Sequence, residues 1–217
     1  MSNESINNKD TNTDALFLQV RSAHRLLAAY YQRLLPTIEC IASGVGANFY
    51  FWESVNFSKP SRNPFKNWPW DMLPGEATRY VFKNISDDKQ VTKNDYIVEF
   101  IVINDTGIND EKYTSQPDAL GLKVKVEEAR SVLRVGIYRA IIDDEVGFYN
   151  QWESGRYPDY SESVDIELDN KFYKFGFEAP LSELMTDFGA GLIKERVMEY
   201  LLKTEEKVSS ESCEFKK

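Results

Sequence analysis

The sequence predicts an α+β fold, with a mostly antiparallel sheet of about six strands flanked by a long N-terminal helix and a C-terminal helix. This prediction rests first on the spacing of apolar residues, which repeat every three or four positions near both ends of the chain. Between residues 47 and 180 the repeat shortens to two positions, as in half-buried strands. Strand-like segments also follow one another without long helical patterns between them, which favours an antiparallel sheet over βαβ units.

The length of 217 residues fits one domain, since a domain usually has roughly 100–200 residues. We expect a disordered arm at residues 1–13, a single α+β domain at residues 14–203 and a flexible tail at residues 204–217. Both ends are polar, so neither buries enough apolar surface to offset the entropy of ordering it.

Residues 14–43 are predicted to form a long amphipathic helix that Gly44 and Gly46 end. Pro36 should kink this helix or start a second one, because proline removes a backbone donor. One row of the helix follows the alternating spacing of four and three residues that helix pairs use: Leu16, Val20, Ala23, Leu27, Tyr30 and Leu34. The full apolar stripe is wider than one sheet face requires, which implies two neighbours. The second neighbour is either the C-terminal helix or a second copy of the chain, and we favour the homodimer.

Alternating apolar residues predict strands at residues 47–57, 76–83, 94–103, 120–126 and 131–142. A helix over residues 126–135 remains an alternative, because that stretch contains good helix formers. Residues 163–168 and 172–178 predict a hairpin around Asp169 and Asn170. The chain then forms a helix from Pro180 to about Lys203, which the Gly189-Ala190-Gly191 stretch should weaken or bend.

The formal net charge is −9, and the acidic excess is concentrated in the middle of the chain. Residues 84–187 contain 22 acidic and 11 basic side chains. This distribution predicts a solvated acidic surface, or a face that meets a basic partner, and it argues against a general nucleic-acid binder. The polar N-terminus lacks a signal-peptide pattern and no stretch reaches ~18 apolar residues, so we expect a cytoplasmic protein without a membrane span. The distant Cys40 and Cys213 predict no structural disulfide.

Neither a catalytic nor a metal-binding motif is evident. The single histidine, His24, lies beside the apolar row of the first helix without an identifiable chemical partner. One histidine and two distant cysteines do not make a zinc site, and we expect no cofactor. The best carboxylate clusters are Asp143-Asp144-Glu145 and the pair Asp165 and Glu167, but their spacing matches no metal motif, so we predict no metal site.

The most promising binding residues are aromatic side chains and arginines in two predicted loops. They are Arg62, Phe65, Trp68 and Trp70 in the first loop, and Tyr149, Trp152 and Arg156 in the second. Rings near cations can stack on a ligand or on a partner's side chain. The alternative is that the prolines of the first loop hold its rings as a lid over one end of the sheet.

These observations favour a non-enzymatic, cytoplasmic binding protein whose partner is another protein. The partner would be met through the acidic strand region or the aromatic loops, with a homodimer through the N-terminal helix. The alternative is a small-molecule-binding α+β domain with an aromatic-lined cavity. A third hypothesis is a metal-dependent enzyme built on carboxylates, such as a nuclease.

Overall fold

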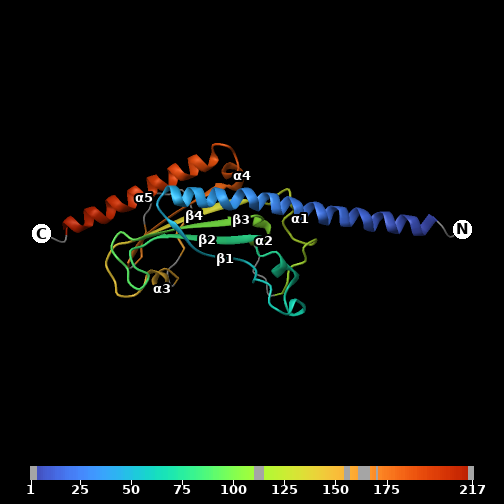
Figure 1. Ribbon diagram of the computed structural model, residues 1–217, viewed down its shortest axis with the longest axis horizontal. Helices are drawn as coiled ribbons and strands as arrows, with labels where there is room; N and C mark the ends of the chain where they lie inside the picture. Colours follow the sequence, from blue (N-terminus) through green and yellow to red (C-terminus); the bar gives the residue numbers. More distant parts are fainter. Residues whose placement is uncertain (1–3, 110–114, 154–156, 161–166, 170, 215–217) are drawn as a thin grey trace. The chain divides into compact units, whose positions relative to one another are not determined.

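The structure is a computed structural model that describes residues 4–109, 115–153, 157–160, 167–169 and 171–214 (Figure 1). The chain divides into two compact units, residues 1–38 and residues 39–217. The first unit contains most of helix α1, Glu4–Gly44, and the second contains the sheet and the remaining helices. The expectation of a single domain over residues 14–203 stays a prediction.

Helix α1 differs from its prediction at two points. It begins at Glu4 instead of residue 14, because extending an existing helix adds one hydrogen bond per residue while starting one is costly. It also continues through Pro36 as one helix, so the second helix expected there does not form. The hydroxyl of Thr37, the residue after the proline, donates to the carbonyl of Arg33 at 2.8 Å. The helix ends as predicted, and Gly46 adopts the left-handed conformation (φ 82°).

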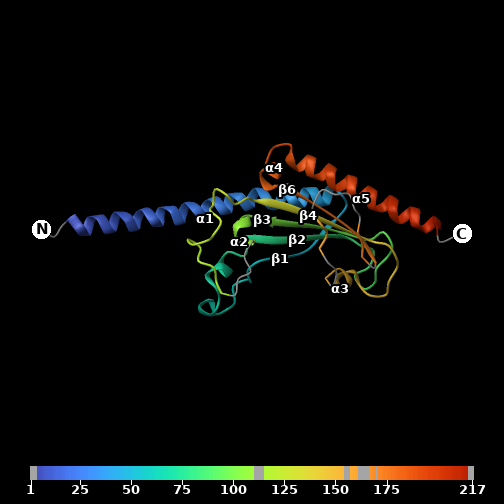
Figure 2. The same cartoon turned by 180° about the vertical axis from the view of Figure 1, so that it is seen from behind.

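The sheet of the second unit contains six antiparallel strands within the described residues, in the spatial order β1-β2-β3-β4-β6-β5 (Figures 1 and 2). Their bounds are β1 Asn48–Ser54, β2 Ala77–Asn84, β3 Tyr96–Ile103, β4 Val132–Ala140, β5 Glu167–Asp169 and β6 Phe172–Pro180. Five strands have seven to nine residues, and β5 has three. The α+β class and the antiparallel sheet are therefore confirmed. β1 is an edge strand, and a bulge between Phe49 and Phe51 shifts its register against β2.

Two predicted elements were wrong. Residues 120–126 form turns and bends instead of a strand. Leu120 there is 98% exposed, because the alternating apolar residues of this segment have no sheet face to pack against. The predicted helix from Pro180 to Lys203 is two helices, α4 Leu181–Leu184 and α5 Gly189–Glu214. A Cβ atom at Gly189 would lie 1.7 Å from the carbonyl oxygen of Glu183. That glycine therefore permits the tight turn before α5, and it does not weaken a helix interior.

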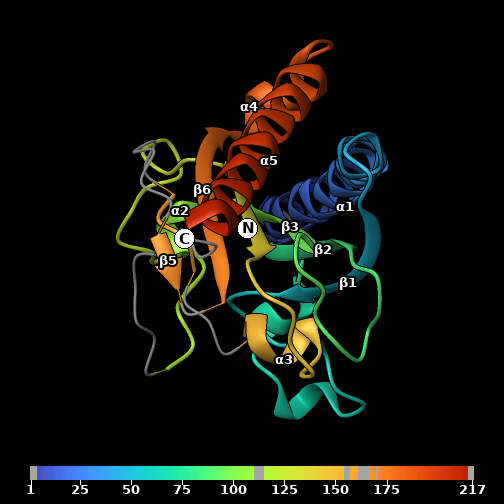
Figure 3. The same ribbon diagram turned by 90° about the vertical axis from the view of Figure 1, so that its left-hand side faces the viewer.

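Helices α5 and α3 (Phe148–Glu153) cover opposite faces of the sheet in the second unit (Figure 3). On the α5 side, the ring of Tyr200 stacks on Phe175 at 3.6 Å between centroids. On the α3 side, the centroid of Trp152 lies 5.9 Å from that of Tyr138. Because alternate residues of a strand face opposite sides, each helix buries its own set of strand residues.

Arg139 fastens α5 to the sheet. Its guanidinium donates hydrogen bonds of 3.0 Å to the carbonyl of Leu201, to the hydroxyl of Thr204 and to the carbonyl of Asn94. A buried arginine requires such partners, because an unpaired buried charge is costly.

Three shorter helical elements complete the fold within the described residues. Helix α2, Thr106–Asn109, follows β3. Two 3₁₀ helices, η1 Pro64–Lys66 and η2 Pro69–Met72, lie in the loop between β1 and β2. None of the described helices is long and apolar enough to cross a membrane.

Candidate interaction site

The N-terminal part of α1 leaves its apolar residues exposed. Between residues 16 and 27, six large apolar side chains are between 40% and 72% exposed: Leu16, Phe17, Leu18, Val20, Leu26 and Leu27. Leu16, Val20 and Leu27 belong to the row with alternating four- and three-residue spacing, and Ala23 within that row is exposed as well. A soluble monomer rarely exposes such a contiguous apolar row without a function for it. We call residues Leu16, Val20, Ala23 and Leu27 the α1 row.

The segment that carries the α1 row is basic, although the chain as a whole is acidic. Residues 14–33 contain Arg21, Arg25 and Arg33 against the single acid Asp14. His24, the only histidine of the chain, lies exposed on the same helix.

The loop between β1 and β2 is held in shape by a buried carboxylate. Asp71 accepts hydrogen bonds from the backbone N–H of Ser58 at 2.9 Å and of Trp68 at 3.1 Å. It also accepts one from the side-chain amide of Asn67 at 3.0 Å. Three donors on one carboxylate join the two ends of the loop, so the loop is a fixed structure and not a loose connection.

The predicted binding residues of this loop separate into packed rings and exposed side chains. Trp70 stacks on Phe57 at 5.2 Å with an interplanar angle of 10°, and its indole N–H donates to the carbonyl of Pro117 at 2.9 Å. Trp68 makes an edge contact with Phe57 at 6.5 Å and is 38% exposed, so it belongs only partly to the packed group. By contrast, Phe65 is 96% exposed, and Arg62 is exposed too. The loop thus presents Phe65 on a supported frame.

The second predicted group lies on α3, where it covers the sheet. Trp152 is buried, with its ring centroid 5.8 Å from that of Phe51. Tyr149 is partly buried, and its ring contacts Tyr50 and Phe51 at 6.2 and 5.6 Å. Arg156 lies outside the described residues. Trp152 and Tyr149 therefore pack in the interior of this face.

A network of charged side chains lies under α3, and it was not predicted from the sequence. Its one signal there is Glu99, an acid within the otherwise apolar strand YIVEFIVI. Glu99 is 0% exposed. Its carboxylate accepts a hydrogen bond from the hydroxyl of Tyr138 at 2.8 Å and pairs with Arg79 at 3.3 Å. Arg79 also pairs with Glu53 and donates to the hydroxyl of Tyr157 at 2.7 Å. Burial raises the pKa of Glu99, while the positive charge of Arg79 and the Tyr138 hydrogen bond oppose that rise.

The network is covered by residues 157–160, which rest on two glycines. Gly136 and Gly176 are register partners on β4 and β6. A Cβ atom at Gly176 would lie 2.9 Å from both Pro158 and Tyr160, so larger residues would displace this cover. Among the described residues, the buried Nε of Arg79 and the buried hydroxyl of Tyr160 find no hydrogen-bond partner. Such groups call for a water or a ligand.

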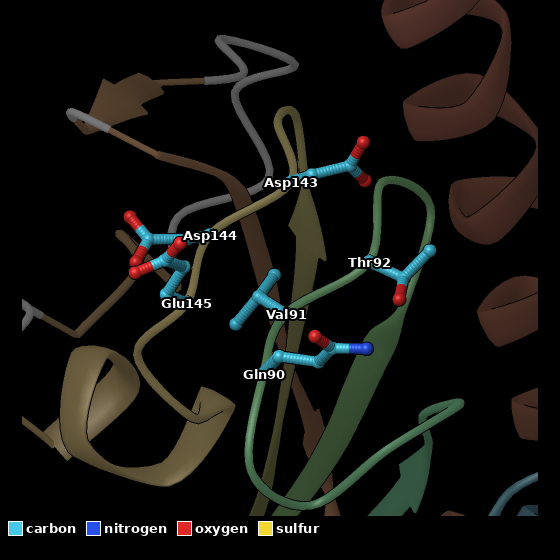
Figure 4. Close-up of a pocket in the computed structure, with 6 residues that line it drawn as sticks. All are labelled: Gln90, Val91, Thr92, Asp143, Asp144 and Glu145. Atoms are coloured by element: carbon cyan, nitrogen blue, oxygen red, sulfur yellow. The ribbon is translucent and has the colours of Figure 1, made fainter.

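An acidic hollow of about 410 Å³ lies where the loop before β3 meets the loop after β4 (Figure 4). Its lining consists of Gln90, Val91, Thr92, Asp143, Asp144 and Glu145. Asp143 points away from Asp144 and Glu145 (Figure 4). Asp144 pairs with Lys171, and Asp143 accepts from the backbone N–H of Lys93 at 2.7 Å.

Within the described part of the chain, no three His, Cys, Asp or Glu side chains are grouped so that they hold a metal ion. Asp165 and the side chain of Glu167 lie outside the described residues. Asp144 and Asp143 of the hollow are thus paired with Lys171 and with backbone N–H groups, which is how such loops are commonly stabilised.

Comparison with known proteins gives one assignment. Searches of curated proteins and of solved structures found no match. The model of a protein family described as PM0109 matches residues 10–206, which include most of α1, the whole sheet and most of α5. Because this match covers far more than half of the sequence, the chain belongs to the PM0109 family.

Proposed function

We propose that the protein is a non-enzymatic interaction protein and that it associates with a second copy of itself through the α1 row. The observation that carries the proposal is the exposure of Leu16, Val20 and Leu27, three side chains of one helical row, at 40% or more. The spacing of this row is that of helices that pack against helices, and a second copy supplies a helix with the same spacing. A two-fold axis would relate the two copies.

The apolar area is large enough to drive association. Fully burying a leucine or phenylalanine stabilises by roughly 1.5–3 kcal/mol. The three row residues and the flanking Phe17 and Leu26 are about half covered already, so they offer roughly 4–7 kcal/mol per helix. A symmetric dimer gains about twice this amount, against an association cost of roughly 4–15 kcal/mol. The gain and the cost are of similar size, so we expect a weak dimer whose population depends on concentration.

Sedimentation of the full chain across a micromolar concentration series tests the proposal. The wild-type protein should shift from monomer to dimer as its concentration rises, and Leu27→Glu should remain monomeric. Leu18→Glu is the matched control, because Leu18 and Leu27 lie about two and a half turns apart and so on opposite sides of α1. A wild-type monomer at every concentration would contradict the proposal. So would unfolding of Leu27→Glu, since that residue would then belong to the core of the monomer.

A small-molecule site on the α3 side of the sheet is a second candidate function. It is supported by the unpartnered Arg79 Nε and Tyr160 hydroxyl, buried near Trp152 and Tyr157. Mass spectrometry of the protein purified from its native host, under native and denaturing conditions, tests it. A bound small molecule would appear as extra mass in the native spectrum alone, and equal masses in both spectra would argue against this function.

A further inference from the structure

Helix α5 carries a second exposed apolar row, on the side that faces away from the sheet. Its inner residues Ile193, Val197 and Tyr200 are buried. Its outer side exposes Leu192 and Leu202, with Met198 beside them and Phe188 just before the helix, at 43–82%. The helix therefore has exposed apolar side chains on its outer side, although the sheet of its own unit covers the inner side only.

The outer side of α5 is also acidic. Glu195 and Glu199 lie between Leu192 and Leu202, and Glu206 follows one turn later. The spacing from Leu192 to Glu206 alternates between three and four residues, so these five residues lie along one line of the helix. We call Leu192, Glu195, Glu199, Leu202 and Glu206 the α5 row. All five are exposed.

The α1 row and the α5 row complement one another in spacing, length and charge. The α1 row extends over roughly 17 Å and the α5 row over roughly 21 Å at 1.5 Å per residue. The α1 segment 14–33 carries three arginines and one aspartate. The α5 row carries three glutamates, of which Glu199 is paired with Lys203 of its own helix. Arg33 flanks the extension of the α1 row, while Arg21 and Arg25 add positive potential on the remaining sides.

We propose that the α5 row binds the α1 row of a second copy, so that the dimer contains two identical contacts between α1 and α5. This inference rests on the proposed self-association and names the surface that receives α1. Contact between the two α1 helices would instead place two segments of the same positive net charge side by side, which is unfavourable. Contact between α1 and α5 places opposite charges across the interface and buries both exposed rows.

The first experiment compares the dimer dissociation constants of single variants by sedimentation. Leu202→Glu should weaken the dimer at least tenfold, as Leu27→Glu does. Leu120→Glu should leave the dimer unchanged, because Leu120 is exposed in a turn outside both rows. If Leu202→Glu dimerises like the wild type while Leu27→Glu does not, the α5 row is not the receiving surface. The inference then fails, although the proposed self-association stands.

The second experiment distinguishes contacts between two chains from contacts within one chain. Glu195→Lys and Arg33→Glu should each weaken their own homodimers, because both contacts then carry like charges near one another. An equimolar mixture should form heterodimers, since one contact is then wild type and the other carries swapped charges. Native mass spectrometry of chains with distinct masses measures the heterodimer fraction. Absence of heterodimers would overturn the inference. A monomeric wild type whose thermal stability falls with both Leu27→Glu and Leu202→Glu would overturn the self-association as well.

Discussion

Single carboxylates in this protein differ widely in their surroundings. Glu99 is enclosed between an arginine and a tyrosine, whereas Asp71 is surrounded by N–H donors. Glu76, just before β2, has one buried oxygen without a partner in the described part of the chain. Burial raises its pKa from 4.5 to about 7, with the nearby charge of Asp105 adding to the rise and a hydrogen bond from Asn56 opposing it.

Glu76 should make the protein less stable as the pH rises through 7. The folded-state pKa lies above the unfolded one, so the stabilisation is fully present below about pH 4.5 and is lost as pH passes 7. Glu76→Gln keeps an acceptor for Asn56 and cannot ionise. We expect the variant to exceed the wild type by about 1 kcal/mol at pH 8, a value discounted for partial exposure, and to show no advantage at pH 4.5. Urea unfolding at both pH values measures this, and equal curves at pH 8 would contradict it.

Phe65 and Trp70 should respond in opposite ways to truncation, although both are aromatic residues of the same loop. Trp70→Ala removes the stack on Phe57 and the hydrogen bond to Pro117, which should cost roughly 3 kcal/mol. Phe65→Ala should change stability by less than about 0.5 kcal/mol, because that ring contacts mainly solvent. Chemical denaturation measures both values. A large loss from Phe65→Ala would show that the ring is packed.

At the scale of elements, glycine positions explain where α1 ends and where α5 begins, whereas Pro36 lies inside α1 and ends no helix. A glycine that is expected to weaken a helix can instead permit the tight turn from which the next helix begins. The break between α4 and α5 depends on Gly189, which lies against the Glu183 carbonyl, whereas a Cβ atom at Gly191 would meet nothing within 4 Å. A Cβ atom would therefore clash with the backbone at Gly189 but not at Gly191, although the two glycines are only two residues apart.

Alanine substitutions at these two glycines should shift stability in opposite directions. Gly191→Ala should stabilise the protein by up to about 1 kcal/mol through helix propensity. Gly189→Ala should destabilise it by about 3 kcal/mol, because the backbone of the turn must move. Thermal unfolding followed by circular dichroism measures both effects. If Gly189→Ala stabilised the protein, the turn before α5 would have room for a Cβ atom, and this prediction would be wrong.

The long strands could be predicted from sequence because their apolar alternation reflects real faces of the sheet. Residues 94–103 and 131–142 match β3 and β4 closely. Residues 120–126 alternate equally well but have no neighbouring strand, and pairing is a long-range property that a local pattern does not report. The charged network was missed for the same reason, since only the register of β2, β3 and β4 brings Arg79, Glu99 and Tyr138 together.

For the molecule as a whole, the charge and the apolar surface are distributed between the two compact units. Residues 1–38 contain the basic segment and the α1 row, while the acidic excess lies within residues 39–217. Since the sheet and α5 form their core within the second unit, that unit has the contacts it needs to fold. The first unit has many exposed apolar side chains, which suits it to association.

Removal of residues 1–27 should separate association from folding. We expect the shortened chain to keep its sheet and to unfold within a few degrees of the wild-type midpoint, because the deleted side chains described from residue 13 onward are exposed. It should also be monomeric at every concentration. Circular dichroism and sedimentation measure the two properties. A shortened chain that fails to fold would show that α1 contributes to the core, and one that still dimerises would place the interface elsewhere.

The bulge in β1 has a consequence for how the protein behaves at high concentration. An edge strand is an open template on which another chain can add a strand, and repeated addition leads to fibrils. The shift of register between Phe49 and Phe51 interrupts the regular ladder of peptide groups, and Glu53 places a charge farther along the same strand. Together they make the outer edge of this aromatic strand a poor site for templated growth. The β1 edge is therefore protected against templated growth, even though the proposed association depends on exposed apolar helices.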